Sequence, residues 1–276
     1  MTFTTIKQPI TIPKILYGTA WKKEHTTALV KQALKAGFQA IDTACQPKHY
    51  REELVGEGIA LSGIARDKLF IQTKFTPEGG QDPESIPYDP KASLDTQVKQ
   101  SFEVSQKNLR TDYVDSLVLH SPLFPFANLL KVWRSMEEIA KAGQAKHIGI
   151  SNCYDLKVLQ KLYENAEVKP AIVQNRFYGE TDYDKALRKW CKATGIVYQS
   201  FWSLTANPHL LYQPEIIQTA KKYGKTPEQI FFSYLMSQGI VPLTGTTSPQ
   251  HMQEDLAVEG DWLEESEVEA ITSLLE

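Results

Sequence analysis

The chain has 276 residues and a formal net charge of −3, from 30 Lys and Arg residues against 33 Asp and Glu residues. Apolar residues make up 42% and charged residues 23%, a composition typical of a globular protein with a large core, which excludes disordered, collagen-like and disulfide-stapled chains. The nearly balanced charge argues against a nucleic-acid-binding protein, which usually carries a clustered basic excess.

Two kinds of segment alternate along the chain. Short apolar runs of strand length occur at residues 15–17, 40–41, 69–71, 114–119, 147–150, 171–173, 196–198 and 240–242. Apolar residues at helical spacing lie between them, and six of these stretches stop at a glycine: Gly37, Gly63, Gly143, Gly195, Gly224 and Gly239. Further helices are predicted near residues 93–109, 155–165 and 264–275. A glycine just after the last turn is typical of a helix end.

The number and spacing of the strands predict the fold. Continuous apolar runs are typical of parallel strands buried on both faces. Their starts, from residue 15 to residue 240, lie about 32 residues apart on average, close to the roughly 30 residues of a βαβ unit. We therefore expect an α/β fold, a (β/α)8 TIM barrel with its active site at the C-terminal face, as one domain over residues 1–276. An open doubly wound sheet would need a Gly-rich turn after its first strand, where the chain has Gly18-Thr19-Ala20-Trp21.

Two connections are longer than the others. Residues 76–92 follow the third strand and residues 203–214 follow the seventh, so both are expected on the face where barrel enzymes place their sites. The alternative for each is a tolerated surface insertion.

Four chemically active side chains stand at or shortly after strand ends. Asp42 ends the second strand, Lys74 the third and His120 the fourth, and Tyr50 follows eight residues after Asp42. Singly, each has a structural explanation: a satisfied histidine, an ordinary ion pair, a packed tyrosine. Together they predict a catalytic site at one mouth of the barrel.

The chemistry of this set suits a carbonyl group that gains negative charge. A phenol is a poor acid at neutral pH, but a neighbouring ammonium lowers its pKa, and a carboxylate keeps that ammonium charged. The sequence therefore predicts a general acid at Tyr50, tuned by Lys74 and Asp42, with His120 either orienting the carbonyl oxygen or sharing the proton of the phenol. No side chain supplies hydride, so carbonyl reduction would require a nicotinamide cofactor.

Several segments between about Pro13 and Leu256 resemble the aldo-keto reductase family. The matching segments are Ile41-Asp42-Thr43-Ala44, Tyr50-Arg51-Glu52-Glu53-Leu54-Val55-Gly56, Thr73-Lys74, Leu119-His120-Ser121-Pro122, Ile148-Gly149-Ile150-Ser151-Asn152 and Val173-Gln174-Asn175. Their order and spacing make the resemblance specific. It implies NAD(P)H-dependent reduction of aldehydes or ketones, with Tyr50 as proton donor and Asp42, Lys74 and His120 as its partners.

The resemblance also implies a cofactor site. Ser151, Asn152 and Gln174 would hold the nicotinamide carboxamide, and Phe201 would stack on the ring in place of the usual Tyr, since Phe keeps the flat face. The residues assigned to cofactor binding are Gly18, Thr19, Asp42, Ser151, Asn152, Gln174, Phe201, Trp202, Leu204, Thr244, Gly245, Thr246, His251, Glu254 and Asp255. Ser248-Pro249 would open a short helix at a phosphate cradle, for which an ordinary helix cap is the alternative.

The sequence departs from the family pattern at two sites. Relatives that use NADPH have Lys and Arg where this chain has Leu243 and His251; NADP(H) is still favoured over NAD(H), because the family usually uses it and nearby hydroxyls could bind the phosphate. The C-terminal loop that covers the substrate in many relatives is not expected here. We therefore expect an open substrate pocket, lined by Trp21, Phe75, Phe124 and Trp202, with core packing as the alternative for Phe75 and Trp202.

The remaining expectations concern partners, location and other functions. The sparse cysteines, Cys45, Cys153 and Cys191, predict no disulfide framework and no metal site, and indicate a cytoplasmic protein. Residues 1–9 resemble no signal peptide, and no apolar run is long enough to span a membrane. We expect a small-molecule carbonyl substrate and a monomer or weak homo-oligomer. The alternatives are a slow nicotinamide-sensing regulatory protein and a lyase with Lys74 as Schiff-base nucleophile, which a charged Lys74 disfavours.

Overall fold

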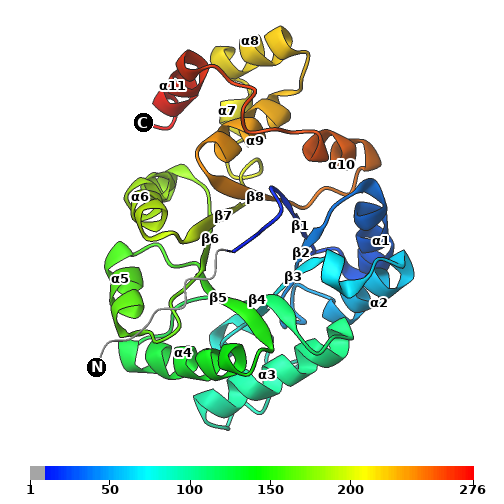
Figure 1. The fold of residues 1–276 in the computed structure, drawn as a ribbon, viewed down its shortest axis with the longest axis vertical. Helices are drawn as coiled ribbons and strands as arrows, with labels where there is room; N and C mark the ends of the chain where they lie inside the picture. The colour runs from blue at the N-terminus through cyan, green and yellow to red at the C-terminus, as the bar shows by residue number, and fades with distance from the viewer. Residues whose placement is uncertain (1–9) are drawn as a thin grey trace.

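The strands close into a barrel, as predicted. The computed structural model describes residues 10–276, in which eight parallel strands pair in chain order and β1 pairs with β8 (Figure 1). The strands are β1 (Leu16–Gly18), β2 (Ala40–Asp42), β3 (Phe70–Phe75), β4 (Val114–Leu119), β5 (Ala145–Ser151), β6 (Ile172–Arg176), β7 (Val197–Phe201) and β8 (Ile240–Thr244). The predicted (β/α)8 barrel is therefore confirmed, and the open doubly wound sheet is excluded.

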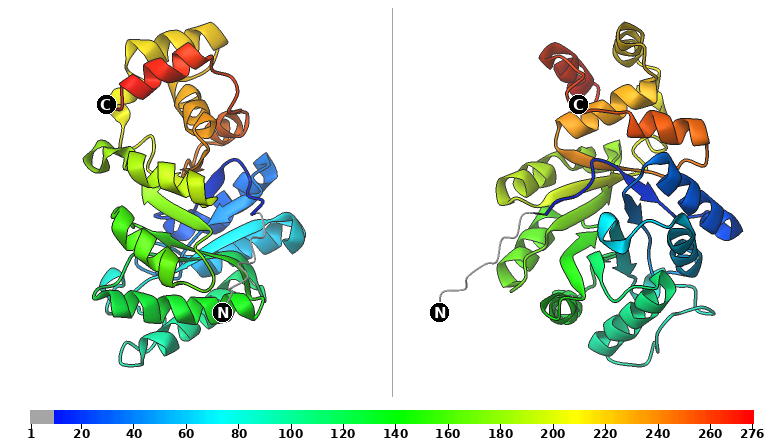
Figure 2. Two further views of the ribbon diagram at one scale, coloured as in Figure 1. Left: turned by 60° about the vertical axis from the view of Figure 1, so that its left-hand side comes forward. Right: turned by 45° about the vertical axis from the view of Figure 1, so that its right-hand side comes forward.

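Helices cover the outside of the barrel (Figures 1 and 2). They are α1 (Thr26–Ala36), α2 (Glu52–Ser62), α3 (Leu94–Leu109), α4 (Phe126–Lys141), α5 (Leu156–Asn165), α6 (Lys185–Thr194), α7 (Pro208–Leu211), α8 (Pro214–Tyr223), α9 (Pro227–Ser237), α10 (Pro249–Leu256) and α11 (Glu265–Ser273). Gly195, at φ 76°, ends α6 by donating to the carbonyls of Cys191 and Lys192, as the glycine pattern predicts. Lys222 of α8 pairs with Glu264 and Glu267 at 2.8 and 2.9 Å, which ties α11 to α8.

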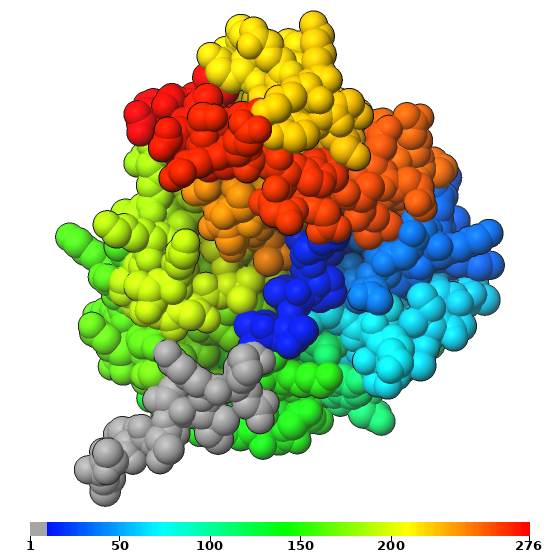
Figure 3. Space-filling model, turned by 45° about the horizontal axis from the view of Figure 1, so that its top comes forward, coloured from blue at the N-terminus to red at the C-terminus, as the bar shows by residue number. Residues whose placement is uncertain are grey.

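Alternation along the strands separates two environments. Ile41, Ile71 and Val173 point outward and pack with the helices in the main apolar core. The intervening residues point into the barrel, because successive side chains of a strand face opposite sides. At the N-terminal ends of the strands the inner residues are apolar, and Ile10 and Ile12 pack against them where the segment before β1 crosses the barrel axis (Figure 3, dark blue).

The inner residues become polar toward the C-terminal ends. Gln72 and Gln199 exchange hydrogen bonds of 2.8 and 3.1 Å across the barrel, and Gln174 donates to Gln199 at 2.9 Å. All three are buried. This glutamine layer is joined by hydrogen bonds among its members and forms the floor of the C-terminal mouth.

Two sequence expectations concern regions beyond the barrel itself. Among the helices of residues 10–276, none is long and apolar enough to cross a membrane. The interpretation of the N-terminal residues 1–9 lies outside the described residues, and the assignment of one domain to residues 1–276 stays a prediction.

Candidate active site

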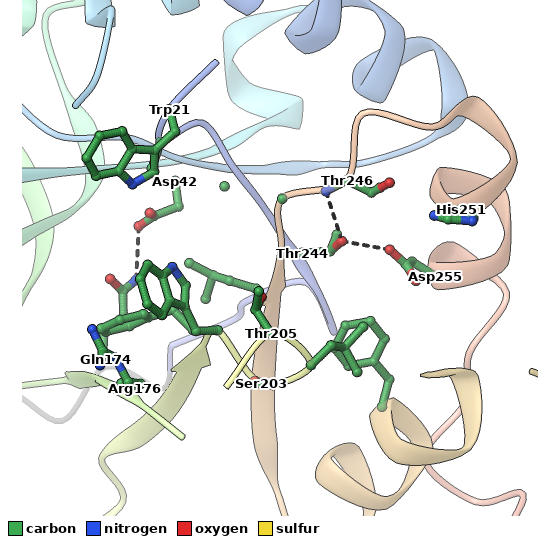
Figure 4. A pocket seen from close by; sticks show the side chains of 18 of the residues that line it. Trp21, Asp42, Gln174, Arg176, Ser203, Thr205, Thr244, Thr246, His251 and Asp255 are labelled. Atoms are coloured by element: carbon green, nitrogen blue, oxygen red, sulfur yellow. Dashed lines mark hydrogen bonds between the residues drawn. The ribbon is translucent and has the colours of Figure 1, made fainter. Parts of the chain in front are cut away.

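A cavity of about 870 Å³ opens at the C-terminal mouth of the barrel. Its walls come from the ends of β1, β2, β5, β6, β7 and β8, the loops that follow them, and the starts of α9 and α10 (Figure 4). The volume lies near the upper end of the 300–1,000 Å³ that is usual for ligand sites. The predicted position of the site, at the C-terminal face, agrees with this cavity.

Lys74 and Asp42 form a buried ion pair beneath the cavity. The Nζ atom of Lys74 donates to both carboxylate oxygens of Asp42, at 2.8 and 2.7 Å, and to the Thr43 carbonyl at 2.9 Å. The two side chains are 1% and 4% exposed. Burial lowers the pKa of Lys74, and the adjacent carboxylate opposes this shift. Because all three ammonium protons have acceptors, the geometry is that of the charged lysine.

The glutamine layer holds the carboxylate of this pair. Asp42 Oδ1 accepts from Gln72 at 2.8 Å and from Gln174 at 3.0 Å, in addition to Lys74. Figure 4 shows the bond from Gln174. A carboxylate with this many donors is held in one orientation. The ion pair is therefore a fixed charge arrangement directly below the groups that face the cavity.

Tyr50 and His120 lie above the ion pair and line the cavity. Their ring centroids are 6.1 Å apart with the rings edge to face, and Lys74 Nζ lies 5.4 Å from the Tyr50 ring centroid. His120 Nδ1 is 2.6 Å from the Thr76 hydroxyl. Burial, followed by the charge of Lys74, lowers the pKa of His120 well below its usual value, so the ring is neutral at neutral pH.

The predicted shift of the Tyr50 pKa is wrong in sign. Burial raises this pKa, and the negative charge of Asp42 raises it further. The ammonium of Lys74 by itself would lower the pKa of Tyr50. The loss of water on burial and the negative charge of Asp42 both raise it, and they outweigh the ammonium. Tyr50 is therefore fully protonated at neutral pH, which is the state required of a proton donor.

Glu52 anchors the segment that carries Tyr50. This buried carboxyl group, in the first turn of α2, accepts hydrogen bonds from Thr73 of β3 and from Ser105 and Asn108 of α3, the latter two at 3.1 and 3.2 Å. Burial raises its pKa. These bonds fix the start of α2 against β3, and so fix Tyr50 above Lys74.

The ends of β5, β6 and β7 supply polar groups and one flat ring. Ser151 donates to the Gln174 carbonyl at 2.6 Å, and Asn152 donates to the His120 carbonyl at 2.8 Å. Phe201 lines the same side of the cavity. An aromatic face beside amide groups fits the ring and carboxamide of a nicotinamide.

The end of β8 and the start of α10 form the other end of the cavity (Figure 4). Thr244 donates to Asp255 at 2.7 Å, and Ser248 caps α10 by accepting from the His251 backbone at 3.3 Å. Burial raises the pKa of Asp255 to about 6. Lys22, from the loop after β1, donates to the Gly245 carbonyl at 2.7 Å. A buried cation and a helix N-terminus beside this turn fit phosphate groups.

Most of the predicted site residues meet at this one cavity. Those that line it are Gly18, Trp21, Asp42, Tyr50, His120, Ser151, Asn152, Gln174, Phe201, Trp202, Leu204, Thr244, Gly245, Thr246, His251, Glu254 and Asp255. Lys74 lies beneath it. The long connection after β7 contributes Ser203, Leu204 and Thr205, whereas the one after β3 packs behind the site, where Tyr88 donates to the Thr76 carbonyl at 2.9 Å.

Three predicted residues are not brought to the cavity. Phe75 is buried in the apolar core 5.6 Å from the Tyr88 ring, because it follows the inward Lys74 and so points outward. Phe124 is 68% exposed on the loop before α4. Thr19 is buried and donates its hydroxyl to the Asp42 carbonyl at 2.9 Å, which joins β1 to β2.

Four residues that sequence reasoning missed lie in or beside the cavity. Gln46, His49 and Arg176 line it, and each has a buried side-chain atom with no hydrogen-bond partner among residues 10–276. Lys22 lies beside the end of the cavity that is formed by the turn after β8. The signal for Arg176 was available, because it follows Gln174 by two positions and must share its side of β6. His49 stacks on Trp21 at a centroid distance of 3.8 Å, which no local pattern indicates.

Comparisons with known proteins agree with this geometry. The sequence profile of the Aldo/keto reductase family matches residues 14–276. A glyoxal reductase of Bacillus subtilis (strain 168) is 32% identical over 236 residues, 85% of this chain and 76% of the relative. MGS-M4, an aldo-keto reductase from a Medee basin deep-sea metagenome library, superposes with a TM-score of 0.83 at 28% identity, over 96% of this chain and 92% of that one. Bombyx mori AKR2E4, solved in complex with NADP, gives 0.79 at 25% identity, over 96% and 89%.

These findings favour catalysis over the regulatory alternative, because the matched relatives are reductases. They also agree with the cavity, which offers an aromatic face and amides at one end and the turn after β8 with the start of α10 at the other. The chain belongs to the aldo/keto reductase family, and it is an NAD(P)H-dependent carbonyl oxidoreductase that reduces aldehydes or ketones to alcohols.

Proposed function

We propose that Tyr50 is the proton donor of this reductase and that small, reactive carbonyl compounds are its substrates. The observation that carries the proposal is the position of Tyr50 and neutral His120 directly above the buried Asp42–Lys74 pair, at the floor of one large cavity. The similarity to a glyoxal reductase supports a substrate with an activated carbonyl group.

Each residue has a distinct task in the proposed reaction. When bound, a dihydronicotinamide supplies hydride to the carbonyl carbon, with its carboxamide held by Ser151, Asn152 and Gln174 and its ring against Phe201. His120 donates a hydrogen bond from Nε2 to the carbonyl oxygen, which polarises the carbonyl group. Tyr50 transfers its phenolic proton to the same oxygen as negative charge develops there.

The Lys74 ammonium stabilises the phenolate that remains on Tyr50. Its distance of 5.4 Å from the ring centroid is short enough for a strong interaction, because Lys74 is buried where the effective dielectric constant is low. The raised pKa of Tyr50 does not prevent the transfer, because the alkoxide that forms on the substrate is a far stronger base than a phenolate. Asp42 keeps the ammonium charged and in place.

The deciding experiment is a comparison of wild type and Tyr50→Phe. The variant removes one oxygen and keeps the ring, so we expect turnover of a reactive aldehyde to fall by about 10²- to 10⁴-fold. The dissociation constant for NADPH, measured by quenching of tryptophan fluorescence, should stay within about twofold. If Tyr50→Phe keeps wild-type turnover, Tyr50 is not the donor.

We propose NADP(H) as the preferred cofactor, with an affinity only modestly higher than that for NAD(H). Lys22 and His251 are the basic residues near the turn after β8, and Glu254 and Asp255 lie beside them. The NADP complex of the silkworm relative supports the preference, and the neighbouring carboxylates limit it by repelling a 2′-phosphate. Titration with NADPH and NADH tests this directly, and a tighter constant for NADH would reverse the assignment.

We also propose a cytoplasmic location. All three cysteines are buried and none forms a disulfide, which suits a reducing compartment. Fractionation of cells that express the full chain tests the location.

A further inference from the structure

Arg176 places its positively charged guanidinium in the cavity, and the reaction proposed above assigns no role to this charge. It is the last residue of β6, two positions after Gln174, and it pairs in register with Phe201 of β7. Its guanidinium carbon lies 4.4 Å from the Trp202 ring centroid and 5.1 Å from that of Tyr178. Figure 4 shows Arg176 beside Gln174, at the end of the cavity away from His251.

The guanidinium has no hydrogen-bond acceptor and no ion-pair partner in the part of the chain that the structure describes. Between residues 10 and 276, no carboxylate lies within 4.0 Å of it and no acceptor receives its hydrogen bonds, and its Nε atom is buried and unpaired. Arg66 shows what a structural arginine looks like in this fold. It also stacks on a ring, that of Tyr113 at 4.1 Å, but it donates to Asp115 at 2.8 Å and to two backbone carbonyls.

Arg176 therefore has the stacking interaction of a structural arginine without the carboxylate. The two aromatic contacts are cation–π contacts, which do not supply an oxygen acceptor to the guanidinium N–H groups. Such a planar fork matches a carboxylate, which it binds through two parallel hydrogen bonds. A buried, unpaired donor is costly, so an anionic ligand at this position would gain the interaction that the protein itself does not supply.

The position of Arg176 separates two sources of such an anion. The cofactor diphosphate is expected at the opposite end of the cavity, where Lys22 and the N-terminus of α10 lie. Arg176 is instead beside Gln174, at the end that would receive the nicotinamide and the reacting carbonyl (Figure 4). A carboxylate belonging to the carbonyl substrate is the occupant that this placement favours.

The walls around this position are held in strained backbone conformations. Trp21, Asn152 and Trp202 all line the cavity, and their φ angles are 64°, 52° and 56°. A left-handed backbone is unfavourable for tryptophan and more easily adopted by asparagine, and such conformations concentrate at ligand sites. In this conformation the Trp202 ring centroid lies 4.4 Å from the Arg176 guanidinium carbon.

We propose that Arg176 binds the carboxylate of an oxo-acid substrate, so that the enzyme prefers carbonyl compounds that carry a carboxylate over their neutral analogues. The proposal rests on the proposed function, because it names the substrate class of the same site. It makes Arg176 a specificity-determining residue, and the bond it forms with the substrate is non-covalent.

The test compares an aldehyde that carries a carboxylate, such as succinic semialdehyde, with its methyl ester. Wild type should show a higher kcat/KM for the acid. Arg176→Met should lower the ratio of the two kcat/KM values by about 10- to 100-fold, mainly through KM for the acid, as expected for loss of charge-assisted hydrogen bonds. Arg176→Lys keeps the charge but not the fork, and should recover part of the ratio. Lys189→Met, which removes an exposed charge of α6, is the matched control and should leave both values unchanged.

The possible outcomes separate the explanations. An unchanged acid-to-ester ratio in Arg176→Met overturns the proposal. If Arg176→Met has a larger dissociation constant for NADPH but an unchanged acid-to-ester ratio, the guanidinium binds the cofactor diphosphate. If wild type reduces neither the acid nor the ester nor any other aldehyde, the proposed function itself fails, whereas reduction of the ester with no effect of Arg176 removes only this inference.

Discussion

Removing Asp42 from the buried Asp42–Lys74 pair should lower the free energy of unfolding, and a second substitution that removes the charge of Lys74 should restore part of the loss. Asp42→Ala removes the two carboxylate acceptors of Lys74 Nζ and leaves only the Thr43 carbonyl at 2.9 Å. Gln72 and Gln174 each lose an acceptor as well. Both members of the pair are at most 4% exposed, so in the intact protein water does not compete for these hydrogen bonds.

The size of the effect follows from this burial. Removing one partner of a buried ion pair costs about 3–5 kcal/mol, because an uncompensated charge remains inside. Lys74→Met in the Asp42→Ala background removes that charge and replaces it with an apolar side chain of similar length. We expect the double variant to be more stable than Asp42→Ala by on the order of 1–3 kcal/mol.

Urea-induced unfolding of the wild type, both single variants and the double variant gives the four free energies that this comparison requires. Glu138→Ala is the matched control, because it breaks the exposed Lys99–Glu138 pair of 2.9 Å and should cost less than about 1 kcal/mol. If the two single effects simply add in the double variant, Asp42 and Lys74 are not coupled, and the argument for a fixed charge beneath Tyr50 is refuted. All three site variants should lose turnover, so only stability distinguishes them.

Three further predictions concern neighbouring groups. Thr76→Val removes the hydroxyl 2.6 Å from His120 Nδ1 and should lower kcat about tenfold, whereas Thr76→Ser should restore it; equal kcat in all three proteins would contradict this role. His251→Arg should tighten NADPH binding but not NADH binding, and equal changes in the two titrations would exclude a 2′-phosphate at this position. Folding raises the pKa of Asp255 from 3.8 to about 6, so the folded state binds the proton more strongly and this carboxyl costs stability as pH rises from about 4 to 6, by up to about 3 kcal/mol. Asp255→Asn should abolish that loss in unfolding experiments at pH 4 and pH 7, and a parallel pH dependence in both proteins would contradict the shift.

The sequence predicted the barrel because its signals are local. Each strand is a short apolar run and most helices end at a glycine, so each unit could be read without knowledge of the others. Asp42, Lys74 and His120 were found for the same reason, since they stand where apolar runs stop. The order of parallel strands then brings those ends to one mouth.

The errors come from properties that depend on neighbours distant in the sequence. The pKa of Tyr50 depends on burial under loops from several strands, so the ammonium alone gave the wrong sign. The placement of Phe75 is a different kind of error, because strand alternation was sufficient to predict it. Lys74 points into the barrel, so Phe75 must point to the helices, and the same rule would have placed Arg176 beside Gln174.

That alternation also explains how a charged site and a stable fold coexist. Outward residues such as Ile71, Ile150 and Val173 pack with the helices and supply the apolar burial that stabilises the barrel. Inward residues near the C-terminal ends contribute little to that core, so polar and charged groups can stand there if they satisfy one another, as the Asp42–Lys74 pair and the glutamine layer do. Arg176 is an inward group whose Nε atom is buried without a hydrogen-bond partner among residues 10–276. A ligand that supplies a carboxylate to the guanidinium would complete this layer. We therefore expect substitution of Arg176 to change the substrate preference and to leave the fold intact.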